Sequence, residues 1–182
     1  MFRLIFILLC GDPADTSVTD ALLPALARCG GVRYFSASRV LRRGEGAGFL
    51  VFETEKIPEI EIGSGILLLK NGIRPQEPVR IPPGFLCVLE TKNAAAAALL
   101  KSSACAAVTC GTGQRDTLSV AGLESAGATL SLQRNLTTLA GKTLEPHDFN
   151  VRFTGERSPH QALFVSAALL ISGADSAAGF VI

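Results

Sequence analysis

The 182-residue sequence contains no tryptophan and a single tyrosine, and aromatic residues make up only 6% of it. Proteins that bind single-stranded nucleic acid stack bases on aromatic rings, so this composition argues against such a partner. Charged residues account for 18% of the chain, and the formal net charge is +1. A chain so close to neutrality has no general attraction to nucleic acid or to an anionic membrane surface. Because the usual charged fraction is about a quarter, we expect some apolar surface to be covered by a protein partner or a second copy.

Paired cysteines of the CxxC kind are missing as well. The chain has five cysteines at scattered positions, namely Cys10, Cys29, Cys87, Cys105 and Cys110. An odd number without paired spacing argues against a disulfide framework and against a zinc site. We therefore expect free thiols that pack as small hydrophobic side chains, and a protein of the reducing cytoplasm.

The N-terminus lacks a hydrophobic run long enough to cross a bilayer. Its apolar stretch covers only Leu4–Cys10 and ends at Gly11-Asp12-Pro13, with no small-residue cleavage site after it. An unbroken apolar run of this length is typical of a buried parallel strand. We therefore expect no membrane insertion and predict a central strand here.

Apolar strands and helical segments alternate up to about residue 115, which predicts a parallel sheet covered by helices. Pro24 should bend the first helix or delay its start. Residues 40–48 contain three glycines, and we expect a loop there. The expected strands are 3–10, 32–36, 49–53, 66–70, 85–89 and 106–110, and the expected helices are 21–29, after a capping box at 17–20, and 93–101.

The pattern changes after residue 115. Short segments at 117–120, 129–133 and 150–153 lie between turns and predict antiparallel strands, and the apolar segment 160–172 predicts a buried final helix. We predict a three-layer α/β fold with a mainly parallel sheet and a small antiparallel extension. It forms one domain over residues 1–182, made of a parallel core (1–115), antiparallel strands (116–155) and a C-terminal helix and tail (156–182).

The segment Leu4–Gly31 has the layout of a phosphate-binding loop: an apolar strand, a tight turn, a Thr-Ser pair and a helix. A loop of the GxxxxGK[ST] type needs glycine and lysine just before the Thr or Ser, and this chain has an alanine and Asp15 there. A carboxylate about 4 Å from a phosphate repels it by a few kcal/mol even at an effective dielectric of about 20. The simpler interpretation is that Asp15, Thr16 or Ser17 only caps the helix.

Several blocks of the chain, in this order, resemble the central ATP-binding domain of the Mur ligase family. The first strand, turn and helix stand where that family has its TGTNGKTT loop. FLVFE, which ends in Glu53, is similar to the family's strand that ends in a magnesium-associated glutamate. ILLLKN, which ends in Asn71, is similar to the family's strand that ends in Thr-Asn. FLCVLETKNAAAAALL resembles the family's strand, acidic turn and short helix, and AAVTCG the strand ending in Tyr-Gly or Phe-Gly. SPHQALFVSAALLISG resembles the GxHNxxNxxAA helix, with His160 on its histidine.

The resemblance implies a vestigial nucleotide site at the carboxyl edge of the sheet, where open α/β folds bind ligands. If that site still worked, ATP and magnesium would be its cofactors, and Thr16 and Glu53 would hold the metal. Otherwise we expect no cofactor, no catalytic residue, and for Glu53 only a solvated strand end. The residues of the vestigial site are Gly11, Asp15, Thr16, Ser17, Asn71, Gly111, Arg115 and His160.

The sequence also departs from the family pattern. Pro13 removes a backbone N–H that could hold a phosphate oxygen. The Asp-His pair expected after Thr-Asn is absent, and Gln161 and Phe164 replace two asparagines, which argues against adenine recognition. No lysine is placed to match the family's carbamylated lysine, and the chain is shorter than an enzyme with flanking substrate domains.

Three functions follow from these observations. The first hypothesis is a non-catalytic Mur-ligase-like protein that works by binding or assembly, as a homodimer or beside cell-envelope enzymes. The second is an ATP-dependent amide ligase relic that still binds nucleotide and magnesium. The third is a small module for a phosphorylated metabolite, held by the backbone N–H groups of the Gly111–Gly113 turn and by Arg115; a plain structural turn is the alternative there.

Overall fold

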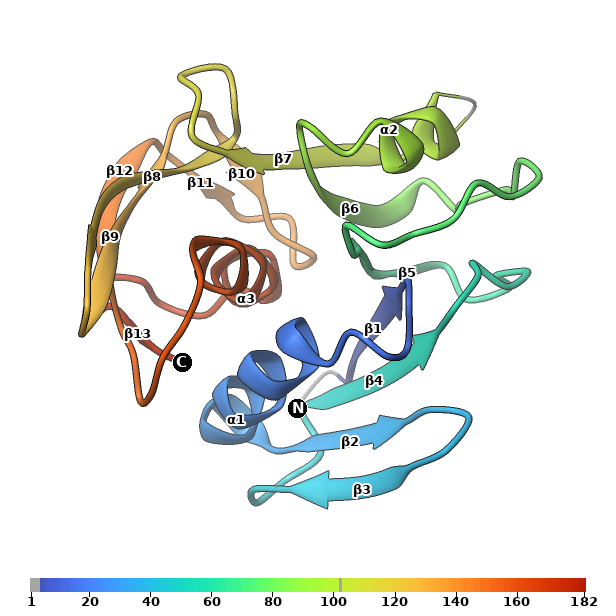
Figure 1. Ribbon diagram of the computed structural model, residues 1–182, viewed down its shortest axis with the longest axis horizontal. Coiled ribbons are helices and arrows are strands. Elements are labelled where there is room, and N and C mark those ends of the chain that lie inside the picture. Colours follow the sequence, from blue (N-terminus) through green and yellow to red (C-terminus); the bar gives the residue numbers. More distant parts are fainter. Residues whose placement is uncertain (1–3, 102) are drawn as a thin grey trace.

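The computed structural model describes residues 4–101 and 103–182 (Figure 1). The helices are α1 (Ser17–Gly30), α2 (Ala94–Leu100) and α3 (Pro159–Ser172). The strands before residue 115 are β1 (Ile5–Cys10), β2 (Val32–Phe35), β3 (Val40–Arg43), β4 (Phe49–Thr54), β5 (Ser64–Leu69), β6 (Gly84–Glu90) and β7 (Ala106–Gly111). Those after it are β8 (Leu118–Glu124), β9 (Gly127–Leu132), β10 (Leu136–Thr137), β11 (Thr143–Leu144), β12 (His147–Arg152) and β13 (Phe180–Val181).

The main sheet has eleven strands in the order β13-β12-β9-β8-β7-β6-β5-β1-β4-β2-β3. The strands from β2 across to β8 pair in parallel, and β1 lies between β4 and β5, where Ile7 faces both Val51 and Ile66. Strands buried on both faces need apolar residues at every position, which explains the unbroken runs of the sequence. The predicted α/β fold with a mainly parallel sheet is confirmed.

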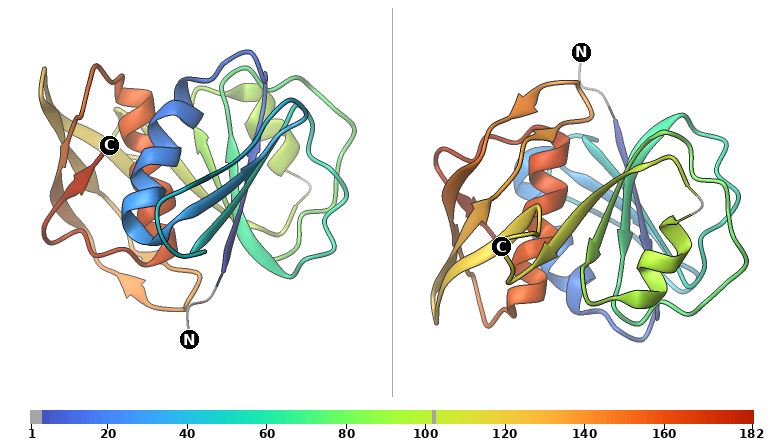
Figure 2. Two further views of the ribbon diagram at one scale, coloured as in Figure 1. Left: turned by 90° about the horizontal axis from the view of Figure 1, so that it is seen from below. Right: turned by 90° about the horizontal axis from the view of Figure 1, so that it is seen from above.

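Helices cover both faces of this sheet. α1 and α3 lie side by side on one face, and the sheet curves around them, while α2 lies on the other face (Figures 1 and 2). Alternate residues of β1 divide between the two cores: Ile7 and Leu9 join the core under α1 and α3, and Leu8 and Cys10 join the core under α2. α3 is apolar on all sides and buried from Gln161 to Ile171, as expected for a helix enclosed by sheet and helix.

The structure corrects several sequence expectations. Residues 40–43 are not loop but the edge strand β3, antiparallel to β2; only its hydrogen bonds to β2 reveal it, because Val40-Leu41-Arg42-Arg43 lacks a clear alternation. The short strands β10, β11 and β13 were also missed. β8 is antiparallel to β9 but parallel to β7, so the antiparallel part begins one strand later than expected.

The start of α1 differs too. Its N-cap is Thr16, one residue before the expected Ser17, and the helix runs from Ser17 across Pro24, so the proline does not delay its start. Arg3, the expected first residue of β1, lies outside the described residues. None of the helices in the described ranges is both long enough and apolar enough to cross a membrane.

Candidate functional site

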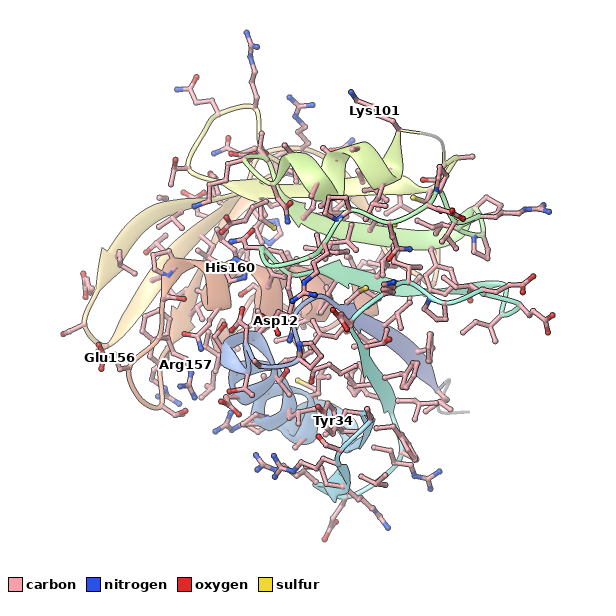
Figure 3. The ribbon with its side chains drawn as sticks, turned by 45° about the vertical axis from the view of Figure 1, so that its right-hand side comes forward. Asp12, Tyr34, Lys101, Glu156, Arg157 and His160 are labelled. Atoms are coloured by element: carbon pink, nitrogen blue, oxygen red, sulfur yellow. The ribbon has the colours of Figure 1, made fainter. Side chains whose placement is uncertain are left out.

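The carboxyl ends of the parallel strands meet at one edge of the sheet and bring the predicted residues toward one another. Cys10 is opposite Thr54 of β4 and Leu69 of β5, so the turn after β1 lies beside Glu53 and Lys70. Figure 3 labels Asp12 in this turn and His160 at the start of α3. The edge holds two clusters of polar side chains, one around Lys70 and one around Glu90.

Lys70 fills the turn between β1 and α1. Its side chain is fully buried, and its ammonium donates hydrogen bonds to the carbonyl oxygens of Asp12 (3.1 Å) and Asp15 (2.6 Å). The same ammonium pairs with the carboxylate of Glu53. A Cβ on Gly11, which has φ +146°, would lie 2.6 Å from the Cβ of Lys70, so only glycine fits there.

Three backbone amides of the turn have acceptors within the protein. Gly11 N–H donates to Thr54 O (3.0 Å), Ala14 N–H to the Asp12 side chain (2.9 Å) and Asp15 N–H to Asp12 O (3.1 Å). A phosphate-binding loop instead turns its free N–H groups toward an anion. Here carbonyl oxygens converge on a cation, so the polarity is the reverse.

Glu53 is 4% exposed, although its place at a strand end predicted contact with water. The prediction that Glu53 is only a solvated strand end is therefore wrong. Its carboxylate accepts hydrogen bonds from Thr19 Oγ1 (3.0 Å), from the Tyr34 hydroxyl and from Lys70. Burial, together with the hydrogen bond to Glu53, raises the pKa of Tyr34 to about 12. The three donors come from α1, from β2 and from Lys70, which directly follows β5.

Asp15 and Thr16 organise the start of α1. Asp15 Oδ1 accepts from the amide of Ser17 (3.0 Å), and Thr16 Oγ1 donates to Asp20 (2.8 Å). Partial burial opposes ionisation of Asp15, but the hydrogen bonds from Ser17 and the nearby charge of Lys70 outweigh it, so the pKa of Asp15 lies below its usual value. Asp15 therefore caps the first amide of α1 from the position before the N-cap, whereas the side chain of the N-cap residue Thr16 makes no capping hydrogen bond.

The second cluster gathers around Glu90, which sequence reasoning did not single out. Glu90 is 5% exposed and accepts from Asn71 Nδ2 (2.9 Å); it also pairs with His160 Nδ1 (2.8 Å) and Lys92 (3.2 Å). Burial raises the pKa of Glu90, but the hydrogen bonds and charges of its three partners lower it by more. The pKa of Glu90 therefore lies below its usual value. Asn71 and His160, both predicted from the resemblance, therefore meet through a third residue.

His160 has one ring nitrogen without a partner. Its Nε2 is buried and has no hydrogen bond to any of the described residues, and its ring packs on Phe164 with centroids 4.3 Å apart. A cavity of about 600 Å³ lies beside it and is also lined by Glu90, Lys92, Gly111 and Asp116.

The Gly111 turn holds an acid of its own. Asp116 is buried, and its carboxylate accepts from the Gly113 amide (2.9 Å) and from the Thr91 hydroxyl. A Cβ on Gly111 would lie 2.4 Å from Asp116 Oδ2. Arg115 is exposed. A phosphate bound in this turn would need free backbone N–H groups, but the amide of Gly113 already donates to the Asp116 carboxylate.

The expected metal ligands, Thr16 and Glu53, have other partners. Within residues 4–101 and 103–182, no group of three or more His, Cys, Asp or Glu side chains is arranged to hold a metal ion. The Thr16 hydroxyl is bonded to Asp20, and the carboxylate of Glu53 faces Lys70. The chain's donors at this edge do not fit a magnesium nucleotide, because an ammonium stands beside the carboxylate.

No protein-family model matches the sequence. No curated protein matches it either. The fold, in contrast, is similar to solved Mur ligases. A UDP-N-acetylmuramoyl-L-alanyl-D-glutamate–2,6-diaminopimelate ligase aligns with TM-score 0.53 and 14% identity over 97% of this chain and 45% of that chain.

Two MurF structures align similarly. The Acinetobacter baumannii protein gives TM-score 0.54 and 13% identity over 96% of this chain and 43% of its own. The Thermotoga maritima protein, solved in complex with ADP, gives TM-score 0.51 and 12% identity over 96% of this chain and 47% of its own. The chain thus spans less than half the length of these structures, an extent consistent with one Mur ligase domain, and the likeness confirms a Mur-ligase-like fold.

Proposed function

We propose that this protein is a non-catalytic, Mur-ligase-like domain that acts by binding or assembly. The observation that carries the proposal is the buried Lys70 ammonium, held by two turn carbonyls and by Glu53. In this proposal the degenerate turn is stabilised by an internal cation and no longer binds phosphate.

Energetics support this interpretation. A triphosphate could enter the turn only if Lys70 moved away and left Glu53 buried and unpaired. Breaking a buried ion pair costs about 3–5 kcal/mol, which weakens an affinity by a factor of about 100 to several thousand. The negative charge of Asp15 would also repel the phosphates and weaken the affinity further.

The proposed partner is another protein or a second copy of this chain. Exposed apolar side chains support it: Val40 is 70% exposed, and Phe35 across from it on the edge hairpin is 39% exposed. A role beside cell-envelope enzymes is part of the same proposal and draws on the similarity of fold.

Calorimetry with ATP, with and without magnesium, tests the proposal. We expect no binding heat for the wild type at millimolar nucleotide. Asp15→Lys is the variant that restores the expected charge, and Asp148→Lys is its control, because it makes the same charge change at an exposed site on β12. Micromolar binding by the wild type that Asp15→Ala weakens would overturn the proposal in favour of the ligase relic.

The phosphorylated-metabolite hypothesis has its own readout. Inorganic phosphate and pyrophosphate should leave the Tm of the wild type unchanged, because Asp116 occupies the Gly113 amide. Thermal stabilisation by either anion that disappears in Arg115→Ala would favour the metabolite module instead.

A further inference from the structure

Two of the cysteines lie side by side on neighbouring strands, away from both clusters at the sheet edge. Cys87 is in β6, and Cys105 directly precedes β7, its parallel neighbour. Their sulfur atoms are 3.0 Å apart. Cys87 is fully buried, whereas Cys105 is partly exposed and packs against the core under α2. One sulfur of the pair is therefore within reach of small solutes and the other is not.

The surroundings give the two thiols different acidity. The hydrogen bond from the Cys87 thiol outweighs the burial of Cys105 and, with the Ser103 hydroxyl 3.0 Å away, lowers the pKa of Cys105 to about 6. The same hydrogen bond and burial raise the pKa of Cys87. The pair thus combines a partly exposed thiol whose pKa is lowered with a buried thiol whose pKa is raised.

We propose that Cys105 reacts with hydroperoxides and that Cys87 is its resolving thiol, so that the pair forms a reversible disulfide between β6 and the residue before β7. The proposal stands on the sulfur–sulfur approach and on the difference in exposure. It adds an oxidisable site to the molecule and does not depend on the state of the Lys70 turn.

The chemistry balances in two steps. The Cys105 thiolate attacks one peroxide oxygen; an S–O bond forms, the O–O bond breaks, and the leaving alkoxide or hydroxide takes a proton from water, giving Cys105 sulfenic acid. The Cys87 sulfur then attacks the Cys105 sulfur; the S–S bond forms, the S–O bond breaks, and water leaves with the Cys87 proton. Two electrons pass from the thiols to the peroxide, and an external dithiol reverses the reaction.

Closing the disulfide requires a small approach of the two sulfurs. A disulfide needs sulfurs about 2.05 Å apart, so the pair must approach by about 1 Å. Cys87 is fixed, because β6 is paired with strands on both sides. Cys105 lies at the end of the connection from α2, where Ser103 N–H bonds Leu100 O (3.0 Å), and is outside the strand ladder. A shift of Cys105 alone would therefore break none of the hydrogen bonds between β6 and β7.

Cys29 provides an internal comparison. It is exposed on α1, and burial of its sulfur raises its pKa. If exposure alone governed reactivity, Cys29 would be oxidised first. If the local environment governs it, the less exposed Cys105 reacts first.

The test treats the full chain with equimolar hydrogen peroxide at neutral pH. Thiol titration in denaturant should fall from five free thiols to three, and peptide mass spectrometry should find Cys87 linked to Cys105, with dithiothreitol restoring all five. Because Cys105 and Cys110 share a tryptic peptide, fragment spectra or a Cys110→Ala background must assign the link.

Matched variants separate the roles. Cys29→Ala should form the disulfide unchanged, and Cys105→Ala should abolish it. Cys87→Ala should leave a sulfenic acid on Cys105 that dimedone traps, formed more slowly than in the wild type because the hydrogen bond that lowers the pKa of Cys105 is lost. Competitive alkylation of the unaltered protein supplies a measurement that no variant's folding can affect: Cys105 should react at least tenfold faster than Cys29. Faster reaction at Cys29, or oxidation without a Cys87–Cys105 link, would overturn the inference.

Discussion

Lys70 is the residue on which the geometry of the candidate site depends. It ends an apolar strand, and its ammonium is neutralised by Glu53, which is 17 residues earlier in the chain. Both charges have lost their water, so each depends on the other and on the neutral donors and acceptors around them. Glu53 is further supported by Thr19 and Tyr34.

Lys70→Met should therefore lower the free energy of unfolding by about 3–5 kcal/mol, because it leaves Glu53 buried without its cation. The double variant Lys70→Met/Glu53→Gln should lose much less than the sum of the two single variants. Urea unfolding followed by circular dichroism measures this double-mutant cycle.

The exposed pair Arg74–Glu55 is the control for that cycle. Its atoms are 3.2 Å apart, but the side chains are 72% and 44% exposed. Water screens such a pair, so we expect a coupling energy below about 1 kcal/mol there. Equal coupling in the two cycles would contradict the role assigned to Lys70.

At the scale of elements, α3 has well-defined ends. Ser158 Oγ accepts from Gln161 N–H (3.2 Å), and Gln161 Oε1 accepts from Ser158 N–H (2.8 Å), which completes a capping box. Gln161 Nε2 also donates to Ser17 O (2.7 Å), joining the first turns of α3 and α1. Gly173, with φ +88°, ends the helix in a left-handed conformation.

Ser158→Ala should reduce the free energy of unfolding by about 1 kcal/mol, because the amide of Gln161 loses its acceptor. Thermal and urea denaturation of the two proteins give this difference. Ser125→Ala, at the exposed turn between β8 and β9, should change stability by less than about 0.5 kcal/mol. A neutral Ser158→Ala would mean that packing alone fixes the start of α3.

Element prediction from the sequence succeeded where a run was apolar, as in β1 and residues 66–69 of β5, because such a run has few alternatives to a buried strand. It failed at β3. That strand has exposed side chains and two arginines, so its identity comes from hydrogen bonds to β2 and not from its own residues.

At the scale of the whole molecule, α3 holds the two parts of the sheet together. It lies inside the curve of the sheet, between the parallel strands and the antiparallel strands (Figure 1). Its side chains belong to the same core as Ile66 of β5 and Leu130 of β9. Phe164, fully buried, is among the largest side chains of that core.

Phe164→Ala should lower stability by about 3–5 kcal/mol through the cavity it leaves. Because the core is continuous, amide hydrogen exchange should show the same loss in β5 and in β9. Phe35→Ala is the control: this side chain is 39% exposed at the end of β2, next to the edge strand β3, and its removal should cost well under half as much. A loss confined to β9 and its neighbours would show that the two parts unfold separately.

The sequence by itself determined the alternation of strands and helices, and it placed Gly11, Glu53, Asn71 and Gly111 at one sheet edge, because parallel strands all end on the same side. It also has Asp15 at the position where the resemblance predicts the lysine of a phosphate-binding loop. Only the tertiary structure decided what fills that loop. Lys70 follows a different strand, β5, and burial makes its pairing with Glu53 strong. Local sequence spacing predicts neither this burial nor a contact between residues 17 positions apart.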